Sequence, residues 1–143
     1  MATLELFGFE DLAESYLRII NIPWPEKEKA LNKMADAGIQ EIRAAGESMG
    51  VRDPESDVHI LDKLKKGKAK QTDSGGYIDV RFSGSRVRNG KRTRNDVIAF
   101  ENEYGNRHQT SRAFVRYAME NKEDEISAGA DELLDWVEDE FNR

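Results

Sequence analysis

One apolar stripe between residues 31 and 49 constrains the fold of this chain more than any other feature. Its members follow one another at steps of three and four residues: Leu31, Met34, Gly38, Ile42, Ala45 and Met49. That spacing predicts a long helix with one apolar face. Pro25 suits the first turn of this helix, where its missing N–H would have no helical partner. The rest of the chain must supply elements that bury the stripe.

Two shorter helices are predicted on either side of the long one. The first spans roughly Glu10 to Ile20 and ends before Pro23-Trp24-Pro25, because proline interrupts helices. The second lies in the stretch DVHILDKLKKG, is capped by Ser56 or Asp57 and ends at Gly67. Its last residues include three cations that suit the negative end of a helix: Lys63, Lys65 and Lys66.

A closing helix is predicted from Ser111 toward the end of the chain. Met119, Ile126 and Leu133 are seven residues apart, which places them on one helical face. Gly129 marks a point of weakness within this helix.

Strands are predicted between these helices. Ile78, Val80 and Phe82 alternate with polar residues, which is typical of a half-buried strand. A turn at residues 73–76 makes Lys68–Thr72 its hairpin partner, and a third strand is predicted over Asp96–Tyr104.

The predicted fold class is therefore α+β. A small antiparallel sheet of three or four strands packs against N-terminal helices and a long C-terminal helix. The chain has 143 residues, of which 38% are hydrophobic, enough for one core, so we expect a single domain over residues 1–143.

The composition of the chain indicates the cellular compartment in which the protein is made. The chain has no cysteine and no long apolar run, and its first residues lack the basic start and apolar core of a signal peptide. We expect a soluble protein made in a cytoplasm, without disulfides, thiolate metal sites or membrane contact.

Charge is distributed unevenly along the chain. Residues 63–94 contain eleven Lys and Arg and two Asp, a local charge of +9. Because the whole chain carries −6, the remainder carries −15. A basic middle between acidic ends indicates either nucleic-acid binding or subunits that meet basic face to acidic face.

No set of residues in the sequence has the pattern of a catalytic or metal site. His59 has only Asp62 and Lys63 at helical spacing, too few ligands for a metal. His108 has no carboxylate to orient it, and its neighbours Thr110 and Ser111 suit a helix cap better than a nucleophile. We expect no enzyme activity and no cofactor.

The chain resembles a family of small phage tail proteins, the minor tail or tail-completion components of long-tailed phages and prophages. The resemblance rests on FENEYG, a short polar turn and SRAFVRYAMENKEDEI, and it covers residues 7–126, most specifically 98–121. Thr110 and Ala113 stand where the family often has prolines, whereas Arg112 and Phe114 match its pattern. By this likeness Tyr104 and Gly105 end a strand, Arg112 extends from the first helical turn and Phe114 enters the core.

The resemblance implies a role in assembly. The protein would join the tail tube to the head connector as a ring of its own copies, sixfold to match the tube, in the virion tail after assembly in the host bacterial cytoplasm. DNA would contact the ring only in passing. The interface would use the cations of the basic segment: Arg86, Arg88, Lys91, Arg92 and Arg94.

The alternative function is a small nucleic-acid-binding module that uses residues 63–94. The stretch SGSRVRNGKRTRN carries five basic residues in thirteen, enough for phosphate contacts. The acidic total charge disfavours this function, and so does the lack of any aromatic residue between Phe82 and Phe100 to stack on bases.

The turn at Asn89-Gly90 raises a question of register. It predicts a tight type I′ hairpin with Arg88 opposite Lys91. If this register continues into the predicted third strand, Ile78 lies opposite Glu101. The apolar residues 78, 80 and 82 of one strand then lie on the opposite face of the sheet from residues 98, 100 and 104 of the other. We therefore predict a β-bulge, or a loop of different length, between residues 83 and 96. Residues 86–94 would then form a mobile basic arm that becomes ordered against a neighbouring subunit.

Overall fold

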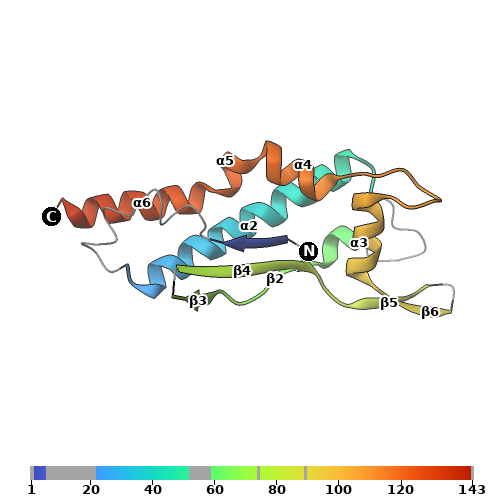
Figure 1. Ribbon diagram of the computed structural model, residues 1–143, viewed down its shortest axis with the longest axis horizontal. Coiled ribbons are helices and arrows are strands. Elements are labelled where there is room, and N and C mark those ends of the chain that lie inside the picture. Colours follow the sequence, from blue (N-terminus) through green and yellow to red (C-terminus); the bar gives the residue numbers. More distant parts are fainter. Residues whose placement is uncertain (1, 6–21, 52–58, 74, 89, 143) are drawn as a thin grey trace.

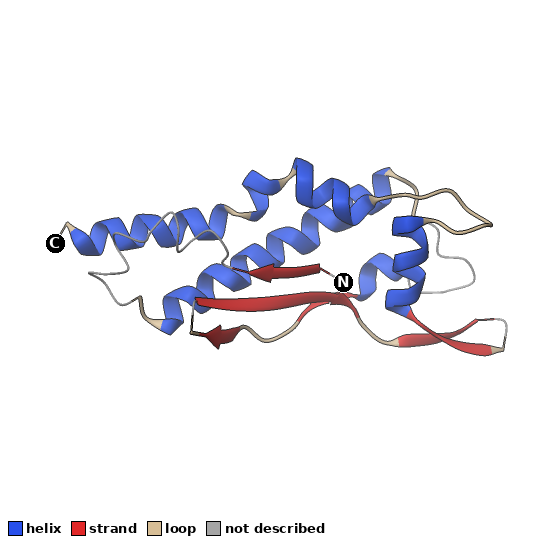
Figure 2. Ribbon diagram, viewed as in Figure 1, coloured by secondary structure: helices blue, strands red, loops and turns tan. Residues whose placement is uncertain are grey.

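The computed structural model describes residues 2–5, 22–51, 59–73, 75–88 and 90–142. The helix predicted over Glu10–Ile20 and the cap predicted at Ser56 or Asp57 lie outside these residues. Helix α2 (Trp24–Ser48) lies between the antiparallel sheet and the C-terminal helices, as Figure 1 shows. Figure 2 shows the strands gathered on one side of α2. The predicted α+β fold class is confirmed.

Helix α2 follows the predicted stripe. Pro23 stands before the helix with extended backbone, Pro25 lies in its first turn and Glu26 adds negative charge at its positive end. The predicted apolar positions are buried from Leu31 to Ala45, and Met49 follows the helix as its C-cap. The buried side of α2 consists of Ala30, Leu31, Met34, Ala35, Gly38, Ile42, Ala45 and Gly46.

Strand β4 (Gly75–Phe82) is the centre of the sheet. It pairs antiparallel with β1 (Ala2–Glu5), β2 (Leu64–Lys66) and β3 (Lys70–Thr72). Ile78, Val80 and Phe82 are buried, whereas the residues between them are at least partly exposed, as the alternating pattern predicts. The predicted hairpin partner is also confirmed, since β3 lies within residues 68–72.

The short helix predicted to end at Gly67 is wrong over most of its length. A single 3₁₀ turn, η1 (Ile60–Lys63), is followed by β2, so Lys65 and Lys66 lie in a strand and are not helix-end cations. The pairing of Leu64 with Phe82 explains the change, because an extended backbone brings Leu64 into the core at 2% exposure.

The third predicted strand is also wrong, because residues 95–104 form helix α3 (Asn95–Tyr104). Asn95, Ile98, Ala99 and Asn102 are buried on one helical face. The residues at 97, 100 and 104 repeat at helical steps on the exposed face. The segment 95–104 is too short for its apolar residues to distinguish the period of a strand from that of a helix. Burial against the rest of the protein favours the helix.

A separate hairpin precedes α3 and consists of β5 (Ser85–Arg88) and β6 (Lys91–Arg94). Arg88 pairs with Lys91, as the predicted tight turn requires. The predicted bulge or altered loop is wrong, because the ladder continues without interruption to Ser85 opposite Arg94. The register conflict disappears once residues 95–104 are helical. We call residues 85–94 the basic arm; it projects beyond α3 (Figure 1).

The predicted closing helix is divided into three: α4 (Phe114–Asn121), α5 (Glu123–Ile126) and α6 (Ala128–Phe141). It starts three residues after Ser111, and the second break falls at Ser127, close to the predicted weak point at Gly129. Gly129 allows close packing, since a Cβ there would lie 2.6 Å from the carbonyl oxygen of Ala30 on α2. Ile126 and Leu133 are buried as predicted.

Phe114 joins the helices to the sheet. Its ring is 0% exposed and meets the Phe82 ring edge-on, with centroids 6.0 Å apart. The predicted core position of Phe114 is confirmed.

We expect Phe114→Ala to lower the free energy of unfolding by about 3–5 kcal/mol, because it removes a fully buried ring and leaves a cavity. Chemical denaturation measures this loss. The matched control is Phe100→Ala, whose ring is 60% exposed and whose loss should stay below about 1 kcal/mol. Equal losses for the two variants would contradict the assignment of Phe114 to the core.

Candidate functional site

Both histidines and the hydroxyl of Ser111 form hydrogen bonds within the protein. His59 caps η1, where its Nδ1 accepts a hydrogen bond from the Leu61 amide at 3.1 Å. His108 Nε2 accepts from Arg107 Nε at 3.2 Å in an exposed turn. Ser111 Oγ donates to the Glu103 carbonyl oxygen at 2.6 Å. Within the described residues, no three His, Asp or Glu side chains are grouped closely enough to hold a metal ion.

We expect His108→Ala to change the free energy of unfolding by less than about 0.5 kcal/mol, because the side chain is exposed and its one bond is local. Self-association should be unchanged, as sedimentation velocity would show. Loss of self-association in a variant of normal stability would contradict a purely local role for His108.

The joint between α3 and α4 uses residues that the sequence singled out, but the expected roles of Tyr104 and Arg112 are wrong. Tyr104 ends a helix, where a strand was predicted, and Gly105 is its C-cap with φ 75°. A Cβ on Gly105 would lie 2.7 Å from the Ser111 nitrogen, so both backbone conformation and space favour glycine. The Arg112 amide donates to the Asn102 carbonyl oxygen at 2.6 Å, which places Arg112 before the first turn of α4.

Glu103 caps α4 from a neighbouring helix, a role that sequence analysis missed. Its side chain is on α3, yet its two carboxylate oxygens accept hydrogen bonds from the Val115 and Arg116 amides at 2.8 and 3.0 Å. A buried carboxylate at the positive end of a helix satisfies donors that would otherwise lack partners. The predicted caps, Thr110 and Ser111, are wrong, and no side chain of the N-cap residue Ala113 takes this role.

Glu103→Ala should lower the free energy of unfolding by about 1–3 kcal/mol, since it leaves two helix-end amides without acceptors. Urea denaturation followed by circular dichroism measures the change. The matched control is Glu120→Ala, which removes an exposed carboxylate from α4 and should change the free energy of unfolding by less than about 0.5 kcal/mol. A Glu103 variant as stable as the Glu120 variant would contradict the capping role.

The base of the basic arm is fixed by a buried asparagine. Asn95, 1% exposed, donates from Nδ2 to the Ser83 carbonyl oxygen at 2.7 Å and accepts from Arg86 Nε at 2.8 Å. The backbone N–H of Asn95 donates to the Gly84 carbonyl oxygen at 3.0 Å. Arg86, predicted as an interface cation, is therefore held within the protomer. These bonds fix where the arm leaves the sheet and where α3 begins.

The outer residues of the arm face solvent. Lys91 and Arg92 are exposed and have no ion-pair partner within the part of the chain that the structure describes. Arg94, whose side chain is 71% exposed, pairs with Asp96. The structure gives the backbone pairing of Arg88. Of the predicted interface cations, Arg86 therefore anchors the arm and Arg94 is ion-paired at its base, whereas Lys91 and Arg92 face solvent nearer the turn.

The last helices carry the opposite charge. Residues 123–141 contain nine Asp and Glu and no Lys or Arg. All nine except Glu140 are exposed. Between α2 and α6 lies an acidic cleft of about 260 Å³, bordered by Trp136 and by four carboxylates: Glu26, Glu132, Asp135 and Asp139.

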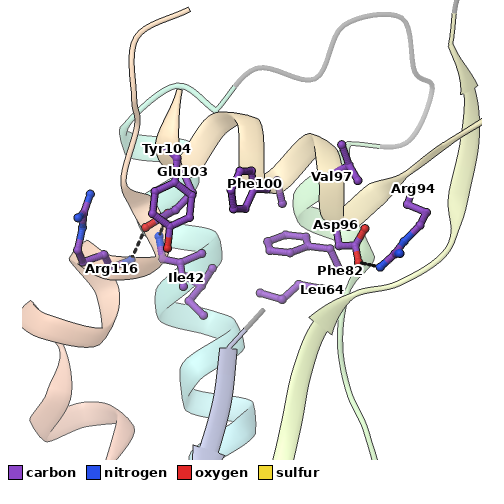
Figure 3. Close-up of a pocket in the computed structure, with 12 residues that line it drawn as sticks. Ile42, Leu64, Phe82, Arg94, Asp96, Val97, Phe100, Glu103, Tyr104 and Arg116 are labelled. Carbon is purple, nitrogen blue, oxygen red and sulfur yellow. Dashed lines mark hydrogen bonds and ion pairs between the residues drawn. The ribbon is translucent and has the colours of Figure 1, made fainter. Parts of the chain in front are cut away.

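An apolar groove of about 470 Å³ runs along α3, and we call it the α3 groove. Its outer wall contains Val97, Phe100 and Tyr104, and the rings of Phe100 and Tyr104 lie 4.7 Å apart. Figure 3 shows these side chains above the core residues that form its floor, which are Ile42, Leu64 and Phe82. Arg94, Asp96, Glu103 and Arg116 border it.

No family model, curated protein or solved structure matches this chain. Within the described residues, every helix is too short or too polar to cross a membrane. Three surfaces of the molecule are candidates for its function: the basic arm, the acidic cleft and the α3 groove.

Proposed function

We propose that the protein is a structural tail component of a phage or prophage, and that its copies assemble head to tail through the basic arm and the acidic cleft. One observation carries this proposal: opposite charges occupy opposite ends of the molecule. The basic arm lies at one end of the long axis and the C-terminal part of α6 lies at the other (Figure 1). The resemblance to tail-completion proteins adds the position near the head–tail junction.

The arm and the cleft have complementary chemistry. The arm residues contribute five cations and no carboxylate, and one of these cations, Arg94, pairs with Asp96. The cleft has one cation, Lys29, and four carboxylates, of which Glu132 pairs with Lys33. A guanidinium such as that of Arg92 can pair with a carboxylate and stack on the face of Trp136. Such pairs guide encounter and register more than they add affinity, and salt weakens them over about 8–10 Å.

The separation of the two surfaces favours a closed or repeating assembly. A contact between different surfaces of identical subunits is heterologous, and it produces a ring when the rotation between subunits closes. A ring of sixfold symmetry, matched to a tail tube, is the form that the resemblance implies. Its outer partners would be the tail-tube and head-connector proteins.

Nucleic-acid binding is the second candidate function, because the outer face of the sheet continues the basic surface. Lys65 lies opposite Arg81 on that face, and the exposed Lys70 lies opposite Tyr77 further along β4. Two cations of the sheet already have partners, since Arg81 pairs with Asp79 and Lys66 with Asp36. This internal neutralisation favours the assembly function.

A charge swap tests the head-to-tail contact. Reversing the arm with Lys91→Glu and Arg92→Glu should weaken self-association roughly tenfold or more at low salt, because like charges then meet at the cleft. Reversing the cleft with Asp135→Lys and Asp139→Lys should do the same. The chain that carries all four changes should recover much of the affinity. Sedimentation equilibrium at low and high ionic strength measures each case.

The matched control reverses two cations outside the arm, Lys65→Glu and Lys70→Glu, and should leave self-association nearly unchanged. Association that is indifferent to salt, or no recovery in the fourfold variant, would contradict the head-to-tail contact. Tight binding to duplex DNA, with an affinity that falls steeply as salt rises and is lost in the arm variant, would support the nucleic-acid function instead.

A further inference from the structure

We infer that the α3 groove is a docking site for an amphipathic helix of a different protein, one that carries apolar anchor side chains flanked by carboxylates. This surface is distinct from the arm and the cleft, and the inference does not depend on the head-to-tail contact. It would give a joining protein a second interface, specific for a partner other than its own copies.

The apolar walls of the groove are the first argument. Val97 is 42% exposed, and Phe100 and Tyr104 are each 60% exposed, although all three are large and apolar or aromatic. They follow one another at steps of three and four residues along α3, so they form a continuous strip about 10 Å long. A contiguous exposed apolar strip above a groove is typical of a protein interaction site.

The length and openness of the groove favour a helix over a small ligand. A small-molecule site encloses most of its ligand, whereas here the aromatic walls remain largely open to solvent. Two turns of helix match the strip formed by residues 97–104, and apolar side chains one turn apart can reach the floor at Leu64 and Phe82.

The charge at the rim argues for an acidic partner. The Asp96 carboxylate is paired with Arg94, and both oxygens of Glu103 accept the amides of α4. The Arg116 side chain remains exposed at the rim. The other cation of the lining, Arg94 at the end of β6, is already paired with Asp96, so within the described residues Arg116 is the lining cation without an ion-pair partner. A carboxylate next to the apolar anchors of a partner would meet Arg116.

A second copy of the chain lacks suitable anchors at its acidic end. Among the side chains that the structure describes, the exposed large apolar residues lie on the arm, on α3 and on α4: Val87, Val97, Phe100, Tyr104 and Tyr117. On α6, Leu133 and Val137 are buried, and Leu134 and Trp136 pack against the core. A head-to-tail neighbour can supply carboxylates but no described apolar anchor for this groove.

Single-stranded nucleic acid is also a poorer fit. Phe100 and Tyr104 contact each other at a tilt of 44°, and the floor between them and α2 is aliphatic as well as aromatic. A stacking platform presents flat ring faces beside unpaired cations. Here the groove offers depth and apolar surface instead.

Three synthetic helices, each about three turns long, test the inference. The first carries Leu and Trp one turn apart on one face and Glu elsewhere. The second has Lys in place of Glu, and the third has Ala in place of Leu and Trp. Each is titrated into dilute ¹⁵N-labelled protein, and amide shifts are followed by NMR. We expect the first helix to shift Val97, Phe100, Tyr104 and Leu64, and the other two to bind at least about tenfold more weakly.

Phe100→Ser should weaken binding of the first helix roughly tenfold or more. Tyr117→Ser removes another exposed aromatic residue, outside the groove, and should bind normally. Circular dichroism verifies that both variants fold, and Tyr104→Ser replaces Phe100→Ser if that variant does not. Equal binding by the Lys helix, or no groove shifts at millimolar acidic helix, would overturn the inference. Groove shifts that depend on protein concentration alone would also overturn it, because they would assign the groove to a second copy. Tighter groove binding by a single-stranded oligonucleotide would overturn it as well.

Discussion

Burial of α2 between the sheet and the C-terminal helices is the constraint on which the remaining structure depends. Leu31 and Ala35 are completely buried, and Ile42 is 1% exposed, because β4 lies along one side of the helix and α4 and α6 lie along the other. Each large side chain buried in this way contributes roughly 1.5–3 kcal/mol. Phe82 of the sheet and Phe114 of α4 contact each other, which joins the two layers that bury α2.

This layered arrangement determines where the charged residues lie. Because the inner surfaces are apolar, exposed cations such as Lys65 and Arg81 lie on the outer face of the sheet, and Lys91 and Arg92 lie on the arm. The carboxylates of residues 123–141 lie on the outer surface of the last helices. Like charges gathered in this way repel one another within a protomer, and a neighbour of opposite charge relieves that repulsion. The buried Asn95 links the arm to the start of α3, so the arm and the α3 groove share one fixed base.

The sequence predicted the elements whose burial has a clear period and missed those that depend on distant partners. The stripe of α2 and the alternation of β4 were sufficient for the fold class, whereas the core position of Phe114 was an expectation from the resemblance to tail proteins. The alternation of residues 96–104 predicts a strand, although the spacing of Val97, Phe100 and Tyr104 is helical, because a ten-residue segment can fit either period. No local pattern reveals that Glu103 caps α4, since its hydrogen bonds join residues twelve and thirteen positions apart. The α3 groove was missed for the same reason, because its floor comes from three separate elements.

Disulfide trapping tests the head-to-tail arrangement most directly, since the chain has no cysteine of its own. One variant carries Thr93→Cys on the arm and another carries Asp139→Cys in the acidic cleft, and the two are oxidised alone and as a mixture at low salt. The account predicts that the mixture forms dimers linked between residues 93 and 139, that each variant alone forms few, and that salt suppresses the product. Dimers linked arm to arm or α6 to α6, in amounts equal to the mixed product, would contradict it.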